Sequence, residues 1–141
     1  MADGMVTEVP MRFADAPLLW TVDDVDSAGE CAQLVGLNER FRYYRYRPGQ
    51  KFAPHMDHWH KLDDQTLTLL TVLVYFNGDF QGGETRFLEQ IEQTVVPVAG
   101  RAAIFQHKIR HEGCPVVSGT KYALRTDVIY RAPSPIALTY A

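Results

Sequence analysis

The sequence has little cysteine, no long apolar run and no excess of positive charge, and each lack excludes a class of protein. Its two cysteines, Cys31 and Cys114, are far apart and form no C-x-x-C motif, so we expect no disulfide framework and a reducing compartment, the cytoplasm. The longest apolar run, around Leu67 to Phe76, is about half of the ~20 residues that a membrane helix needs. The N-terminus has no basic segment followed by an apolar one. We therefore expect neither a secretory signal nor a membrane span.

The charge and the length narrow the choice further. A net charge of −3 and a pI near 5.9 give no electrostatic reason to expect nucleic acid or an anionic membrane as a partner. The 141 residues fit a single domain with one hydrophobic core. We expect one domain over residues 1–141, with its core at about 38–131, and favour a monomer.

Most of the chain has the pattern of short β-strands separated by turns. The expected strands are 41–46, 66–76, 84–88, 94–98, 102–106 and 121–130. Turn-forming residues, such as those of Asn77 to Gly83, lie between them. The strand at 66–76 is apolar on both faces and must therefore be covered on both. The pattern predicts a mainly β sandwich or barrel.

One N-terminal segment has a helical period instead. After the acidic pair Asp23 and Asp24, apolar residues recur at spacings of three and four as far as Leu34 or Val35. This spacing predicts an amphipathic helix from about Asp24 to Val35, ended by Gly36. We expect it to pack outside the sheet and to cover one face of the strand at 66–76.

A candidate metal site begins at His55 and Asp57, which follow a turn at Pro48 and Gly49. In a strand, residues i and i+2 point the same way, so both side chains can hold one metal ion. A third ligand should be a histidine from another strand, and His107 and His111 are both available. Two histidines and one carboxylate are the ligand set of non-haem Fe(II) oxygenases.

Six blocks occur in an order that resembles the prolyl 4-hydroxylase group of 2-oxoglutarate/Fe(II) dioxygenases, over about residues 38–131. A single His-x-Asp is common by chance, whereas six ordered blocks are not. The blocks are Tyr46-x-Pro-Gly-Gln50-x-Phe52-x-x-His55-x-Asp57, Thr71-Val-Leu-Val-Tyr75-Phe-Asn77, Gly82-Gly83-Glu84-Thr85, Gly100-Arg-Ala-x-Ile-Phe105, His111-Glu-Gly-Cys-Pro115-Val and Gly119-Thr-Lys121-Tyr122.

The resemblance implies a double-stranded β-helix, or jelly roll, with Fe(II) held by His55, Asp57 and His111. His111 is preferred to His107 because the family places this ligand directly before the x-Gly-x-Pro-Val block. Lys121 matches the basic residue that pairs with the distal carboxylate of 2-oxoglutarate. The remaining matches are co-substrate contacts at Tyr46, Thr71 and Tyr75, and a pocket wall at Leu73. The implied reaction also uses O2, with ascorbate as reductant.

Alternation along the last strand puts Lys121, Ala123, Arg125 and Asp127 on one face. That face points either to solvent or to the interior of a barrel, and the burial of Lys121 distinguishes the two. Arg125 can help to neutralise the co-substrate, meet an acidic substrate, or pair with Asp127 or Glu84. The resembling hydroxylases do not regularly carry Arg-x-Asp here, which leaves the substrate open.

The resulting hypothesis is a dioxygenase that hydroxylates a C–H bond, in a prolyl or related residue of a peptide or protein. One alternative is an oxygenase that acts on a free small molecule. Another is a cupin-like module that binds a metal or ligand without turnover. The loop residues His58 and His60 either contact substrate or are simply solvated. Trp59 between them either contacts a proline-like ring or packs in a small satellite cluster.

Overall fold

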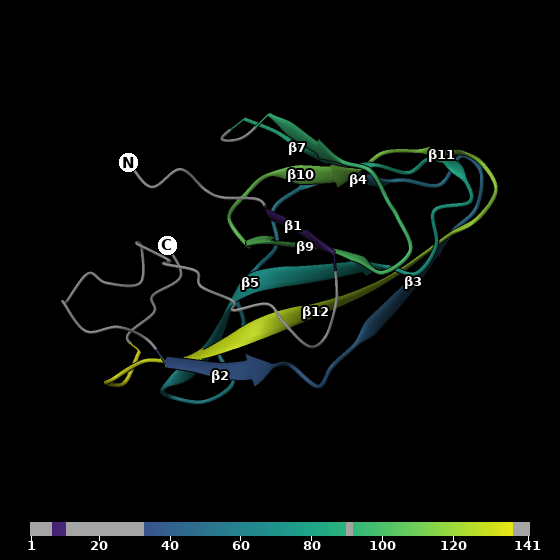
Figure 1. Cartoon of the computed structure of the whole chain (residues 1–141). Coiled ribbons are helices and arrows are strands. Elements are labelled where there is room, and N and C mark those ends of the chain that lie inside the picture. The colour runs from purple at the N-terminus through teal and green to yellow at the C-terminus, as the bar shows by residue number, and fades with distance from the viewer. Residues whose placement is uncertain (1–6, 11–32, 90–91, 137–141) are drawn as a thin grey trace.

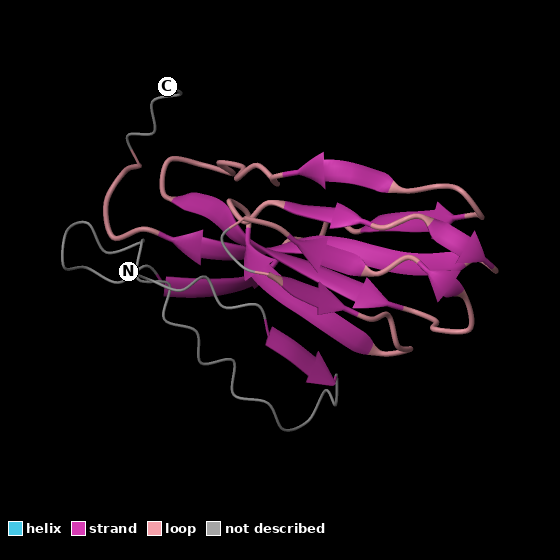
Figure 2. Ribbon diagram, turned by 90° about the horizontal axis from the view of Figure 1, so that it is seen from above, coloured by secondary structure: helices cyan, strands magenta, loops and turns pink. Residues whose placement is uncertain are grey.

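The computed structural model describes residues 7–10, 33–89 and 92–136, and every regular element in these ranges is a β-strand (Figures 1 and 2). No helix in these ranges has the length and apolar character needed to cross a membrane. The prediction of a mainly β protein is confirmed. The strands are β1 (Thr7–Pro10), β2 (Gln33–Leu37), β3 (Arg42–Tyr46), β4 (Phe52–His55), β5 (Thr66–Tyr75), β6 (Gln81–Gly82), β7 (Thr85–Phe87), β8 (Gln93–Val95), β9 (Arg101–Gln106), β10 (His111–Gly113), β11 (Val116–Ser118) and β12 (Lys121–Arg131).

The strands form two main antiparallel sheets that lie opposite each other (Figure 1). The larger sheet has the order β1-β9-β5-β12-β2, and the smaller one β4-β10-β7-β8. The long strand β12 takes two partners in turn along one edge, β3 opposite residues 121–125 and β2 opposite residues 128–131. A short pair, β11 and β6, stands apart from both sheets.

Strand β5 has buried apolar side chains on both faces of the larger sheet, as its continuous apolar run predicts. Tyr75 and Leu73 point toward the smaller sheet and join a buried cluster with Phe87 and Phe105. Val72 and its neighbours at alternate positions join a second cluster on the other face. The first cluster packs between the two sheets. Two of its members, Leu73 and Phe105, lie beside the polar side chains of the interior.

The predicted helix is wrong at its C-terminal end. Residues 33–37 form strand β2, which pairs with the last part of β12, and Gly36 lies inside this strand instead of ending a helix. The apolar side chains of Leu34, Val35 and Leu37 are all about half exposed, so no helical face of the described chain is buried here. The rest of the predicted helix, residues 24–32, lies outside the described residues.

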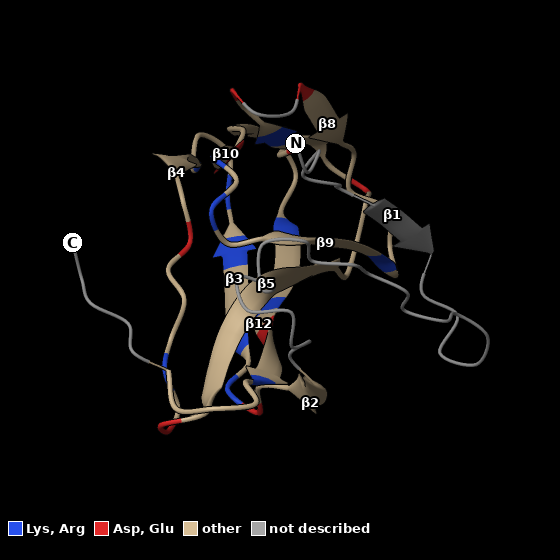
Figure 3. Ribbon diagram, turned by 90° about the vertical axis from the view of Figure 1, so that its left-hand side faces the viewer, with Lys and Arg blue, Asp and Glu red and all other residues tan. Residues whose placement is uncertain are grey.

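Charged positions are arranged differently by sign (Figure 3). Most of the described acidic residues lie in the connections between strands, whereas basic residues recur along β3 and β12. Two of these basic residues, Lys121 and Arg125, point from β12 into the interior and are buried or nearly so. The interior face of β12 therefore carries two cations, together with the buried carboxylate of Asp127.

Candidate active site

His55 and His111 face each other as direct cross-strand partners of β4 and β10. Their ring centroids lie 4.4 Å apart. In each ring, Nδ1 lies within hydrogen-bond distance of a backbone carbonyl two residues earlier, Ala53 O at 2.6 Å and Ile109 O at 2.9 Å. Because a carbonyl oxygen only accepts, Nδ1 carries the proton in both rings, and both Nε2 atoms keep a free lone pair.

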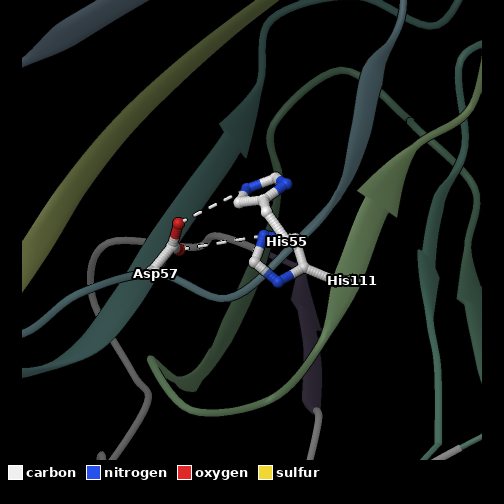
Figure 4. A group of neighbouring side chains, drawn as sticks. All are labelled: His55, Asp57 and His111. Carbon is white, nitrogen blue, oxygen red and sulfur yellow. Dashed lines mark ion pairs between the residues drawn. The ribbon is translucent and has the colours of Figure 1, made fainter.

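Asp57 faces both of these Nε2 atoms (Figure 4). Its Oδ1 lies 3.5 Å from His55 Nε2, and its Oδ2 lies 3.8 Å from His111 Nε2. One donor atom from each of the three residues lies within 4.8 Å of the other two. Asp57 and His111 are buried and His55 is half-buried, so the group is accessible to solvent on the side of His55. The arrangement can hold one metal ion.

Local electrostatics keep the carboxylate ionised and one imidazole neutral. Burial opposes ionisation of Asp57, but the contact with His55, the hydrogen bond from Thr71 and the charge of Arg125 outweigh it and hold its pKa well below the usual range. Burial lowers the pKa of His111. The pKa of His55 is raised, because its contacts with Asp57 and Ala53 outweigh the effect of burial. At neutral pH Asp57 and His111 are thus already in the forms that ligate metals.

Lys121 faces the interior and is only 4% exposed. Its ammonium group donates to Gly83 O at 2.7 Å and lies 5.1 Å and 5.5 Å from the ring centroids of Tyr46 and Tyr75. Burial lowers its pKa to about 8. No acidic side chain of the described residues forms an ion pair with it. A buried cation of this kind is suited to a ligand that brings a negative charge.

These groups line one pocket between the two sheets, with a volume of about 450 Å³ including its open mouth. Of the residues expected to contact the co-substrate, Lys121, Tyr46, Thr71, Leu73 and Arg125 are in its wall. Tyr75 is fully buried behind the wall, where its hydroxyl meets Thr85 Oγ1 at 2.6 Å. The complete lining is Tyr44, Tyr46, Phe52, His55, Asp57, Thr71, Leu73, Thr85, Phe105, His111, Gly113, Lys121, Ala123 and Arg125.

The lining residues that were not expected as site residues include Tyr44, Phe52 and Thr85. Phe52 stacks on His55 with 4.0 Å between ring centroids, and Tyr44 meets Phe52 edge-on. Phe52 and Thr85 stand inside two of the six ordered blocks, so the sequence carried a signal for both. Tyr44 reaches the pocket because it alternates with Tyr46 on β3 and points the same way.

The structure also answers what Arg125 pairs with. Its Nη2 donates to Asp127 Oδ1 at 3.3 Å, and its Nη1 lies 3.3 Å from Asp57 Oδ1. The guanidinium therefore stands between two buried carboxylates, and one of them belongs to the metal-binding group. Pairing with Asp127 was among the expected alternatives, whereas the contact with Asp57 was not.

The other histidines lie outside the three-residue group. His107 is buried, with its ring nitrogens near the hydroxyls of Thr71 and Thr68. His58 and His60 are exposed and Trp59 is half-buried. None of the four is in the pocket wall.

Comparison with known proteins places this site in a family. The family model described as the 2OG-Fe(II) oxygenase superfamily matches residues 41–126. A comparison with curated protein sequences finds no match. Among solved structures, a Pseudomonas putida prolyl-4-hydroxylase is 28% identical with a TM-score of 0.51, and the match covers 69% of this chain and 55% of that one.

Two further structures agree with this match. A viral collagen prolyl hydroxylase from Paramecium Bursaria Chlorella virus-1, in a 2OG complex, is 26% identical with a TM-score of 0.50, over 67% of this chain and 62% of that one. A Trichoplax adhaerens prolyl hydroxylase, in complex with a peptide fragment, is 21% identical with a TM-score of 0.55, over 69% of this chain and 46% of that one. This chain thus matches only about half to three fifths of their lengths. The expected jelly-roll fold is confirmed.

Proposed function

The chain belongs to the 2OG-Fe(II) oxygenase superfamily, and on that premise we propose that it is a 2-oxoglutarate- and Fe(II)-dependent dioxygenase that hydroxylates a prolyl or related residue of a peptide. One observation carries the proposal. Two histidines and an aspartate line a pocket that is also lined by a buried lysine, and this lysine has no acidic ion-pair partner among the described residues. That pairing of a metal-binding group with an unneutralised cation is what a chelating dicarboxylate requires.

The residues present fit Fe(II). Two imidazoles and one carboxylate suit ferrous iron, whereas structural zinc sites use more thiolate or histidine ligands. Both histidines present Nε2 to the same point, since Nδ1 of each ring donates to a backbone carbonyl. In the proposal, His55, Asp57 and His111 hold the ion. When bound, iron supplies the activation of O2 and 2-oxoglutarate that leads to C–H hydroxylation, succinate and CO2.

The protein's own residues do the positioning. Lys121 binds the distal carboxylate of 2-oxoglutarate, with the ring of Tyr46 beside its ammonium group. Leu73 and Phe105 form apolar walls that keep water from the reacting atoms. Tyr75 supports the site from behind, through Thr85 and Lys121.

A peptide substrate is favoured over a free small molecule by the mouth of the pocket. The rings of Tyr44 and Phe52 line it beside His55, and Phe52 is 39% exposed. An exposed aromatic edge of this kind can bind a non-polar ring carried on a longer chain. The similarity to prolyl hydroxylases, at 26–28% identity, gives further support.

The direct test is to incubate the protein with Fe(II), ascorbate and 2-oxoglutarate and to measure succinate, with and without a panel of proline-containing peptides. We expect succinate formation that a peptide stimulates, together with a peptide mass gain of one oxygen atom. Stimulation by free amino acids instead would assign a small-molecule substrate. A protein that binds the metal but yields no succinate under any condition is a binding module and not an oxygenase.

A further inference from the structure

Asp57 is held from behind by a hydroxyl. Thr71 donates to Asp57 Oδ2 at 2.6 Å. Thr71 Oγ1 also lies 2.8 Å from His107 Nδ1. A hydroxyl has one proton, and here the carboxylate accepts it. The contact with His107 is therefore a hydrogen bond in which Nδ1–H donates to Thr71 Oγ1.

The other ring nitrogen of His107 extends the chain. Nε2 lies 3.0 Å from Thr68 Oγ1, and this oxygen accepts from the backbone N–H of His60 at 2.9 Å. Thr68 is fully buried, so its proton must go to a protein acceptor, and Nε2 is the acceptor within reach. His107 is thereby the neutral Nδ1–H tautomer, which agrees with burial lowering its pKa to about 4.

The surrounding charges leave this assignment intact. Asp127 Oδ1 is 3.9 Å from His107 Nε2, beyond hydrogen-bond distance, and it already accepts from Arg125. The backbone also ties the two ends together, because Asp57 N–H donates to His107 O at 2.9 Å. Side chain and main chain of Asp57 are both fixed to the same histidine.

We propose that Thr71 and His107 are positioning residues for the metal carboxylate. Hydrogen bonds run in one direction from the His60 N–H through Thr68, His107 and Thr71 to Asp57 Oδ2, and they hold the carboxylate in one orientation. The inference rests on the proposed function only in that Asp57 ligates the metal. Partners that orient metal ligands typically change metal affinity by about 10–100-fold when they are removed.

The variants that test the proposal distinguish the loss of a hydrogen-bonding group from a change in side-chain size. Thr71→Val removes the hydroxyl at nearly constant volume, and Thr71→Ser keeps it. His107→Leu removes both ring nitrogens, and His107→Asn keeps a side-chain N–H near the position of Nδ1. Thr126→Val is the matched control. Thr126 is also a buried threonine, but its hydroxyl donates to Asn38 O and takes no part in the series of hydrogen bonds that leads to Asp57.

Affinity for Co(II), followed by its visible absorption, is the readout because it needs no turnover. We expect Thr71→Val and His107→Leu to weaken binding about 10–100-fold, and Thr71→Ser, His107→Asn and Thr126→Val to stay within about threefold of the original chain. If the residues act in series, the double variant Thr71→Val/His107→Leu is no weaker than Thr71→Val. Unchanged affinity in Thr71→Val, or fully additive losses, would overturn the proposal.

A measurement on the unaltered protein tests the proposal even if the variants fail to fold. The ring nitrogen chemical shifts of His107 in ¹⁵N-labelled protein report its tautomer, and we expect Nδ1–H. An Nε2–H tautomer would contradict the chain as drawn. Co(II) affinity that depends on Thr71 in a protein that makes no succinate would leave this inference standing while the proposed function fails.

Discussion

Arg125 places a guanidinium between two buried carboxylates, 3.3 Å from an oxygen of Asp57 and 3.3 Å from one of Asp127. Its Nε is buried without a hydrogen-bond partner. Removal of this cation takes away the ion-pair partner of two buried acids, and such losses cost about 3–5 kcal/mol.

We therefore expect Arg125→Met to lower the free energy of unfolding of the metal-free protein by about 3–5 kcal/mol, measured by denaturant titration. Arg131→Met, at the exposed end of the same strand, is the control and should change it by no more than about 0.5 kcal/mol. A loss below about 1 kcal/mol in Arg125→Met would mean that the pairing is not a stabilising one.

The two downstream histidines should differ in what their loss removes. His111 presents Nε2 to the metal-binding group, whereas the ring of His107 reaches it through Thr71. At saturating Co(II) we expect His111→Ala to bind no ion, and His107→Ala to bind one ion with reduced affinity. Equilibrium dialysis with metal analysis measures both. The reverse pattern would reassign the ligand.

The sequence could place His107 near the site but could not give it a role. Its partners, Thr68 and Thr71, lie far from it in the chain and come within reach only when β5 pairs with β9, with Leu70 opposite Gln106. No local pattern encodes that register. The ligands His55 and Asp57, by contrast, need only the alternation of a single extended segment.

At the scale of elements, a metal ion held by the proposed ligands joins parts of the fold that have few other ties. Strand β4 is an edge strand of the smaller sheet and pairs only with β10 among the described strands. Asp57 lies just beyond the end of β4 and accepts a hydrogen bond from Thr71 on β5, in the larger sheet. The ion thus links β4, β10 and the larger sheet.

Metal removal should therefore loosen a defined region. We expect chelation of Co(II)-loaded protein to speed amide hydrogen exchange in β4 and β10, while exchange in β2, which pairs with the far end of β12, stays the same. Mass spectrometry of peptides from each strand measures this. A uniform change over all strands, or none in β4, would argue against ligation by this group.

The long strands and some short ones, such as β7 and β8, were predictable, whereas β2, β6, β10 and β11 were not. β5 and β12 carry runs that only a sheet can bury, and both lie where the sequence indicates. The helical spacing that ends in Leu34 and Val35 was misleading, because β2 is an exposed edge whose side chains show no alternation in burial. Its structure is decided by pairing with β12. The three residues of β10, His111–Gly113, contain no β-branched or aromatic residue that would indicate a strand.

At the scale of the whole molecule, Lys121 makes stability depend on pH. Its pKa falls from 10.5 to about 8 in the folded chain because of burial. Between these values the unfolded chain binds the proton and the folded chain does not, so stability rises with pH through this window. Below about pH 8 both forms are protonated, and the full cost of burying the charge, on the order of 3 kcal/mol, is present.

We expect the free energy of unfolding of the ligand-free protein to increase between pH 8 and about 9.5, and Lys121→Met to remove most of this increase. Higher pH is avoided because the pKa of Tyr46 is raised to about 12, which reverses the slope once tyrosines of the unfolded chain ionise. Denaturant titrations at several pH values measure the effect. The same slope in Lys121→Met would assign it to other groups.

Under the proposed function, the buried ammonium group of Lys121 also ties the lifetime of the protein to metabolism. A ligand that binds only the folded chain adds RT ln(1 + [L]/Kd) to its stability, about 2.7 kcal/mol at a hundredfold excess over Kd. When 2-oxoglutarate is scarce, a larger fraction of the protein molecules is unfolded at any time and is exposed to proteases. The amount of enzyme would then follow the supply of the molecule it consumes.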